Sequence, residues 1–206
     1  MKNKSKLFIA ECRNMKFEFW IPFLLFGFLF LYAQLMKSEQ ELLFGNLQFL
    51  ATPLATWWMI QAFYYFVEDE GGEVYFTYSI SRRYLGIDRF FFFYSLYAAL
   101  ILILLASCGL FRMQVLILFL IQGYLLQAVA FFLILYVRSI VLSLGSIIIY
   151  VGINMLNSTI SNSIISIYIE YGGIESVMYK SLLIFGIGTC FLYLAQRKLE
   201  RFEFVS

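Results

Sequence analysis

The sequence predicts an all-α integral membrane protein with six transmembrane helices, and three observations lead to this class. Of the 206 residues, 62% are hydrophobic and only 14% are charged, whereas roughly a quarter of the residues in a soluble domain are charged. Several charge-free stretches reach about 18 residues or more, which suffices at 1.5 Å per residue to cross a hydrocarbon core of about 30 Å. The charges gather between these stretches, most densely in the polar segment 68–89.

Residues 1–18 are expected to form a cytosolic amphipathic leader. The leader carries five basic residues, Lys2, Lys4, Lys6, Arg13 and Lys16. In a helix, apolar side chains fall within one narrow stripe, namely Phe8, Cys12, Met15 and, at the start of the first span, Phe19. Such a helix lies on the cytosolic leaflet with its basic face toward anionic headgroups. The alternative is a basic tail that only orients the first span.

The hydrophobic runs place two spans in residues 19–67 and four in residues 90–195, all within one transmembrane domain. The expected spans are, in order, 19–36, 47–67, 90–110, 114–137, 139–157 and 180–195. Pro53 falls near the start of the second span, where its missing N–H costs least. The longer polar connection 158–179 joins the last two spans, and residues 196–206 form a cytosolic tail.

The placement of lysine and arginine sets the expected orientation. With the N-terminus inside, the leader, the polar segment, Arg138 and the tail together hold twelve of the fifteen basic residues, and the outside keeps Lys37, Arg112 and Lys180. Because basic residues accumulate on the cytosolic side, both termini and the polar segment are predicted to face the cytosol. We expect a multi-pass protein of the plasma membrane of a bacterial cell.

Several kinds of chemistry are excluded by what the sequence lacks. It contains no histidine, so His-based acid–base catalysis and the HExxH metalloprotease site are ruled out. Its three cysteines, Cys12, Cys108 and Cys190, fit neither a disulfide framework nor a metal site. No G-x-x-x-x-G-K-[ST] motif is present to cradle ATP. An enzyme, a cofactor held by this chain and a nucleic-acid partner are therefore not expected.

The polar segment 68–89 is the candidate docking element. It must leave the bilayer, because an unpaired charge in hydrocarbon costs several kcal/mol. Its charged residues are Glu68, Asp69, Glu70, Glu73, Arg82, Arg83, Asp88 and Arg89. Aromatic and aliphatic side chains alternate loosely with two of the arginines, as on many protein-docking surfaces. The alternative is an ordinary solvated loop.

This segment also carries a family resemblance. The layout Glu-Gly…Ser-Ile-Ser-Arg-Arg-x-x-x-x-x-Arg, between the second and third of six spans, resembles the permease subunits of ABC-2-type exporters. In that family the segment is the coupling helix, which sits in a cleft of the ATP-binding subunit. The resemblance assigns ATPase docking to Glu70, Gly71, Ile80, Ser81, Arg82, Arg83 and Arg89. Tyr84, one of the aromatic side chains beside the arginines, completes the set of candidate docking residues. The proline frequent in the family's core is Ser79 here, so the start of the helix is less sharply fixed.

A polar stripe on the fifth span is the candidate translocation path. It consists of Ser139, Ser143, Ser146, Tyr150, Asn154 and Asn157, whose spacing keeps them on one helix face within about 80°. Gly145 and Gly152 share the opposite side, where they permit close helix contact. In the resembling family the path lies between two permease subunits, and the fifth span helps to form it. The alternative role of the stripe is hydrogen bonding between helices.

The second span offers a candidate second wall of this path. Gln48, Thr52 and Thr56 share one face of the expected helix. The alternative is that the two hydroxyls bond back to their own helix, as is common for threonine.

The resulting prediction is a transmembrane permease subunit of an ATP-driven ABC-2-type exporter that moves an amphipathic or hydrophobic cargo, such as a peptide or an antimicrobial. The resemblance implies two copies of an ATP-binding subunit, which hold ATP and Mg, and a second permease subunit, identical or related, all in the lipid bilayer. Two alternatives stay open: a membrane-embedded substrate-binding subunit of an ATP-dependent vitamin uptake system, and a non-transporting membrane immunity or sensor protein.

Overall fold

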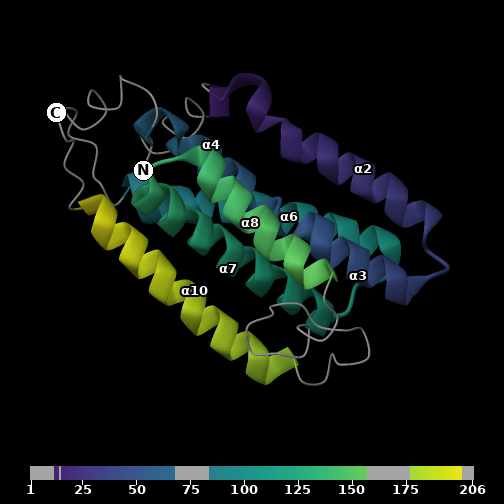
Figure 1. The fold of residues 1–206 in the computed structure, drawn as a ribbon. Helices are drawn as coiled ribbons and strands as arrows, with labels where there is room; N and C mark the ends of the chain where they lie inside the picture. The colour runs from purple at the N-terminus through teal and green to yellow at the C-terminus, as the bar shows by residue number, and fades with distance from the viewer. Residues whose placement is uncertain (1–11, 14, 68–83, 157–176, 201–206) are drawn as a thin grey trace.

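The computed structural model describes residues 12–13, 15–67, 84–156 and 177–200. Throughout this part of the chain the regular structure is helical, and the helices lie side by side in an elongated bundle (Figure 1). In chain order the elements are η1 (Lys16–Phe19), α2 (Ile21–Leu35), α3 (Gln40–Ala51), α4 (Ala55–Val67), η2 (Tyr84–Asp88), α6 (Arg89–Cys108), α7 (Met113–Val137), α8 (Ile140–Leu156) and α10 (Val177–Glu200).

Four helical segments are long and apolar enough to cross a membrane. They are Lys16–Leu35, Leu85–Cys108, Met113–Val137 and Lys180–Glu200, and Ile140–Asn154 is a shorter apolar helix. The all-helical class expected from the sequence is thus confirmed, and the apolar helices are compatible with a membrane protein. The number of six spans and the cytosolic placement of the termini stay predictions.

The segment expected to form the second span differs from the prediction, because it contains two helices. α3 ends at Ala51 and α4 begins at Ala55, with Pro53 between them. Proline lacks an N–H, and its ring clashes with the carbonyl four residues earlier, so a helix is interrupted there. Between the two helices the backbone hydrogen bonds span three residues instead of four. The Leu54 N–H donates to the Ala51 carbonyl at 3.3 Å and the Ala55 N–H to the Thr52 carbonyl at 3.2 Å. The single helix expected over residues 47–67 is corrected to a pair.

α7 forms the centre of the bundle, with α4, α6, α8 and α10 packed around it (Figure 1). Its side chains are buried at most positions from Val115 to Leu135. Ring contacts give the direction of the neighbouring helices. The centroids of Phe44 and Phe119 are 6.0 Å apart, and those of Phe63 and Phe131 are 5.0 Å apart. Both α3 and α4 therefore run in the same direction as α7.

α10 also runs parallel to α7, whereas α6 runs antiparallel to it. Tyr124 stacks on Phe185 with centroids 5.2 Å apart, and farther along both helices Lys198 lies over the ring of Tyr136 at 5.1 Å. In contrast, the start of α6 lies beside the second half of α7, where the Gln127 side chain donates to the Phe90 carbonyl at 2.9 Å. These directions are those expected of helices that cross a membrane in alternation.

Two left-handed residues end α6 and α7. Gly109 follows α6 with φ 74°, and Arg138 follows α7 with φ 54°. A left-handed residue commonly terminates a helix, and glycine adopts this conformation at no steric cost. The spans expected over 114–137 and 139–157 are therefore separated by a turn at Arg138, and Gly109 ends α6 just before the expected end of the third span at residue 110.

The outward faces of the peripheral helices are apolar. Exposed side chains on α2 include Leu24, Phe28, Leu31 and Leu35, and on α8 they include Val141, Leu142, Ile148, Ile149 and Ile153. Continuous exposed apolar surface is typical of faces that meet a membrane or a partner protein. Both helices thus expose apolar side chains on the outside of a packed interior.

Candidate coupling element and polar path

The described part of the docking element begins at Tyr84. The candidate docking residues Glu70, Gly71, Ile80, Ser81, Arg82 and Arg83 lie outside the described residues. Tyr84 opens η2 and Arg89 opens α6. The structure therefore shows how the end of the polar segment joins the bundle.

η2 packs closely against the end of α10 at Gly86. A side chain at Gly86 would overlap the Oε1 atom of Gln196 and would lie 3.1 Å from Leu199. The Gln196 side chain is itself 5% exposed, and its Nε2 atom donates to Glu200 at 2.9 Å. The end of the polar segment is therefore in contact with α10, and a side chain at Gly86 would require the Gln196 amide to shift.

Arg89 is buried and connects α6 to α4. It is 2% exposed, and its Nη1 atom donates to the carbonyl oxygen of Ala62 at 3.0 Å. The guanidinium also lies 5.4 Å from the centroid of the Phe63 ring, within the range of a cation–π interaction. Arginine suits such a site because it combines several donors with a flat, weakly hydrated cation. The docking role of Arg89 stays a prediction, and the contacts given above join it to α4.

The polar stripe of the fifth span lies at the border between the packed and the open side of α8. Ser143 is fully buried and Asn154 is 4% exposed, whereas Ser146 is exposed. At about 100° per residue, Ser143 and Asn154 lie toward one edge of the stripe and Ser146 toward the other, which explains the difference. Ser139 and Tyr150 are half-buried between them, and Asn157 lies outside the described residues.

Three members of this stripe bond to the backbone of their own helix. The Ser143 hydroxyl donates to the Ser139 carbonyl at 2.7 Å, the Ser146 hydroxyl to the Leu142 carbonyl at 2.8 Å, and the Asn154 amide to the Tyr150 carbonyl at 2.7 Å. Such local bonds satisfy hydroxyl and amide donors within a helix. The Oδ1 atom of Asn154 is buried and meets no donor among the described residues.

The candidate second wall is buried inside this chain. Gln48, Thr52 and Thr56 are each at most 2% exposed. The two hydroxyls bond to their own chain, Thr52 to the Gln48 carbonyl and Thr56 to the Pro53 carbonyl. Gln48 also contacts α7, because its Oε1 atom accepts a hydrogen bond from Gln122 Nε2 at 2.9 Å. The role of these residues as a path wall stays a prediction, and their described contacts join α3 and α4 to the centre.

Sequence reasoning missed the two amides of α7. Gln122 and Gln127 are fully buried, and they contact α3 and α6 respectively. The sequence does contain an indication that these side chains are buried, because both amides lie inside a charge-free run of apolar residues. A polar side chain in such a run is expected to face the bundle rather than lipid.

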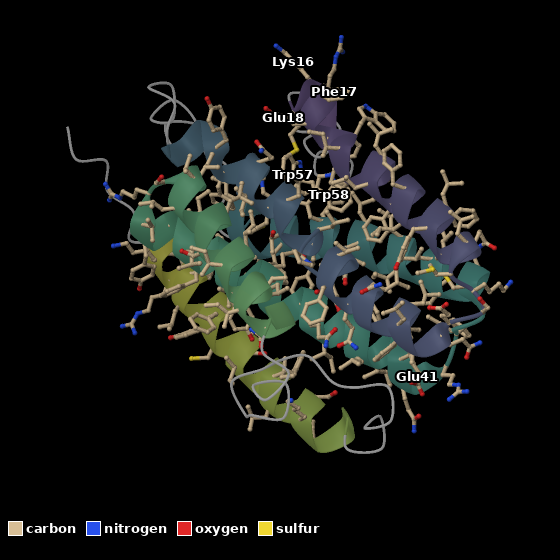
Figure 2. All side chains as sticks on the ribbon, turned by 45° about the vertical axis from the view of Figure 1, so that its right-hand side comes forward. Lys16, Phe17, Glu18, Glu41, Trp57 and Trp58 are labelled. Carbon is tan, nitrogen blue, oxygen red and sulfur yellow. The ribbon has the colours of Figure 1, made fainter. Side chains whose placement is uncertain are left out.

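Sequence reasoning also did not foresee how two tryptophans fasten the N-terminal turn. Trp57 Nε1 donates to the Glu18 carbonyl and Trp58 Nε1 to the Phe19 carbonyl, both at 3.0 Å. In Figure 2 the two tryptophans lie beneath η1, while Lys16 and Phe17 point away from the bundle and Glu41 lies near its opposite end. Trp58 is fully buried and stacks on Phe93 with centroids 6.4 Å apart. These tryptophans thus pack within the protein, with their N–H groups satisfied by backbone.

Comparison with protein-family models, with curated proteins and with solved structures finds no match to this chain.

Proposed function

We propose that this chain is a six-span permease subunit of an ATP-driven ABC-2-type exporter, with both termini and the polar segment 68–89 in the cytosol. The cargo we propose is amphipathic or hydrophobic, of the class of peptides and antimicrobials. Two ATP-binding subunits and a second permease subunit, identical or related, complete the transporter. The proposal rests on the resemblance of the polar segment to the coupling helix and on the layout of the apolar helices.

The observation that best supports this proposal is how the end of the polar segment joins the bundle. Gly86 seats η2 on α10, and Arg89 links the start of α6 to α4. α7 in turn packs against α4, α6 and α10. A force applied to the polar segment from the cytosol is therefore delivered to three helices that surround the central one. A solvated loop needs no such attachment.

The mechanism follows from this attachment. ATP binding closes the pair of ATP-binding subunits, and the coupling element transmits the movement to α4, α6 and α10. Interfaces between packed helices are bistable, so small shifts at one end are amplified into rearrangements of whole helices. The cargo is then expelled along a path between the two permease subunits, with the polar edge of α8 as one lining.

The test is co-purification of the parent protein against an Arg82→Glu, Arg83→Glu variant under gentle extraction. We expect an ATP-hydrolysing partner to accompany the parent and to be lost from the variant, because reversing two charges at a docking surface places like charges against the partner. The matched control is Lys37→Glu, Arg112→Glu, which makes the same charge change at the opposite side of the membrane. This control is expected to retain the partner.

Each other outcome points elsewhere. A partner that stays with both variants places the docking site outside residues 82–83 and favours the vitamin-uptake subunit. A failure of any ATPase to accompany the parent removes the transporter proposal and favours the immunity or sensor protein.

A further inference from the structure

The ends of α7 and α10 carry a cluster of exposed cations. Arg138 ends α7 with an exposed side chain, and Arg197 and Lys198 lie in the last turn of α10, with Arg197 exposed and Lys198 half-buried. The two helix ends are neighbours, because Lys198 Nζ lies 5.1 Å from the centroid of the Tyr136 ring, two residues before Arg138. We call Arg138, Arg197 and Lys198 the basic patch.

Aromatic side chains extend from the basic patch into the seam between the two helices. Tyr136 stacks on Phe132 with centroids 4.2 Å apart, and Phe132 meets Phe191 of α10 edge-on at 5.1 Å. Tyr136 is 48% exposed. Positive charge at the helix ends is therefore continuous with an apolar, ring-lined surface that descends along the bundle.

The described acids near the patch, Glu200 and Asp88, lie on a different side of α10 from Lys198, whereas Arg197 precedes Glu200 by three residues and lies about 60° from it around the helix. Glu200 is bonded to Gln196, and both belong to the side of α10 that seats Gly86 of η2. At about 100° per residue, Lys198 points about 200° away from Gln196. Asp88 belongs to η2 and so lies on the Gln196 side as well. Among the described residues, the charged side chains where α7 and α10 end side by side, Arg138 and Lys198, are thus positive.

We propose that the basic patch binds the phosphate headgroup of an anionic phospholipid, whose acyl chain lies along Tyr136, Phe132 and Phe191. Basic clusters between membrane helices on the cytosolic side bind anionic headgroups in this way. Tyrosine at this depth presents an apolar body to the chain and a polar tip to the interface. The proposal does not depend on the export function, because it needs neither an ATP-binding subunit nor a cargo.

The experiment is a lipid titration of the detergent-solubilised, full-length protein, followed by native mass spectrometry. Phosphatidylglycerol is the anionic probe and phosphatidylcholine of the same chains is the zwitterionic comparison. The test variant is Arg197→Gln, Lys198→Gln, and the matched control is Lys37→Gln, Arg112→Gln at the opposite end of the bundle. Both remove two cations from exposed helix ends, and both are checked for an unchanged elution volume and melting temperature.

We expect the parent and the control to bind phosphatidylglycerol in preference to phosphatidylcholine. The test variant is expected to bind it about 30-fold more weakly, since each basic residue near a headgroup contributes about fivefold. Should that variant fail to fold, Arg138→Asn replaces it with an expected loss of about fivefold, because asparagine tolerates the left-handed conformation that this position adopts.

Three results overturn the proposal. One is equal binding of the two lipids by the parent, and another is an equal loss in the test variant and the control. The third is displacement of phosphatidylglycerol by millimolar inorganic phosphate, which would assign the patch to a free anion instead of a lipid.

Discussion

At the scale of single residues, two glycines set how closely helices approach α7. A side chain at Gly123 would overlap the Tyr97 ring of α6, and one at Gly188 of α10 would meet the Tyr124 ring at 2.8 Å. Tyr97 has little room to move, because it is fully buried and its hydroxyl donates to the Phe119 carbonyl at 3.2 Å. The absence of a side chain at each glycine therefore leaves the room that the tyrosine ring of the neighbouring helix occupies.

Replacement of Gly123 by alanine is expected to lower the melting temperature of the detergent-solubilised protein. The added methyl group forces the Tyr97 ring out of its site, and overpacking of this kind costs about 1–3 kcal/mol. Thermal unfolding followed by circular dichroism measures the change.

The matched control is Gly27→Ala on α2, because a side chain there has no described atom within 4 Å. This variant is expected to melt with the parent or slightly above it, since alanine favours the helix over glycine. A Gly123→Ala protein as stable as the Gly27→Ala protein would show that Tyr97 adjusts freely.

The sequence could not distinguish these glycines from the others. It singled out Gly145 and Gly152 as places for close helix contact, yet no described atom of this chain lies within 4 Å of where a Cβ at either position would stand. Whether a glycine receives a neighbour depends on which face of its helix turns inward, which is decided by residues far away in the chain. The polar stripe of α8 shows the same limit: its alignment was predictable, but which edge is buried was not.

At the scale of elements, the break between α3 and α4 is braced by a pair of amides. Gln48 lies just before the break, and its side chain accepts a hydrogen bond from Gln122 of α7 at 2.9 Å. Both amides are at most 1% exposed. The interrupted segment is therefore fixed to the centre of the bundle by a polar contact close to the point where its helical bonding is weakest.

A double-mutant cycle of Gln48→Leu and Gln122→Leu measures this brace. Each single change leaves the opposite amide buried with one bond fewer, so the double variant is expected to lose less than the sum of the two. Hydrogen bonds between membrane helices contribute about 0.6 kcal/mol on average and at most about 1.7 kcal/mol. Unfolding in increasing dodecyl sulfate gives the four free energies of unfolding.

A matched comparison is the cycle of Gln48→Leu with Gln127→Leu, because Gln127 bonds to Phe90 of α6 instead. Those two changes are expected to be additive, as is usual for distant sites without shared partners. Additivity in both cycles would mean that the amide pair provides no brace.

Most of the helices could be predicted from the sequence, but the ends and the break could not. Charge-free runs located α6, α7 and α8 to within a few residues, because hydropathy reports directly which residues avoid water. α10 continues to Glu200, beyond the expected end at residue 195. Hydropathy marks the lipid boundary, whereas helical hydrogen bonding continues through polar residues. Pro53 signalled a helix boundary, but it was expected near the start of one helix and instead lies between two.

At the scale of the whole molecule, the directions of the helices agree with the alternation expected of successive spans. α4, α7 and α10 run one way and α6 runs the other, so Arg138, Arg197 and Lys198 gather at one end. Arg112 lies just before the start of α7, at the other end of the bundle. The cluster of three is expected to face the cytosol, since basic residues are retained on that side.

Labelling of single cysteines in whole cells tests this orientation. The parent for this test has Cys12, Cys108 and Cys190 replaced by alanine. Two single-cysteine proteins are made from it, one with Ser38→Cys and one with Glu200→Cys, and both positions are exposed. A membrane-impermeant maleimide is expected to label Ser38→Cys in intact cells. It is expected to label Glu200→Cys only after the cells are permeabilised.

The reverse pattern would invert the predicted orientation. Labelling of both positions in intact cells would place an even number of membrane crossings between residues 38 and 200, against the odd number that six spans require.

The position of α7 at the centre has a consequence for how the chain is assembled as it is synthesised. The amide of Gln122 bonds to Gln48 and that of Gln127 bonds to Phe90, and both partners precede α7 in the chain. If the predicted spans are inserted in chain order, the Nε2 donor of each of these amides therefore finds its acceptor on a segment that was made earlier. α10 emerges last and closes the remaining side with its Gly188 seat for Tyr124. The order of residues along the chain thus lets both amide donors of α7 find their acceptors as soon as α7 itself is made.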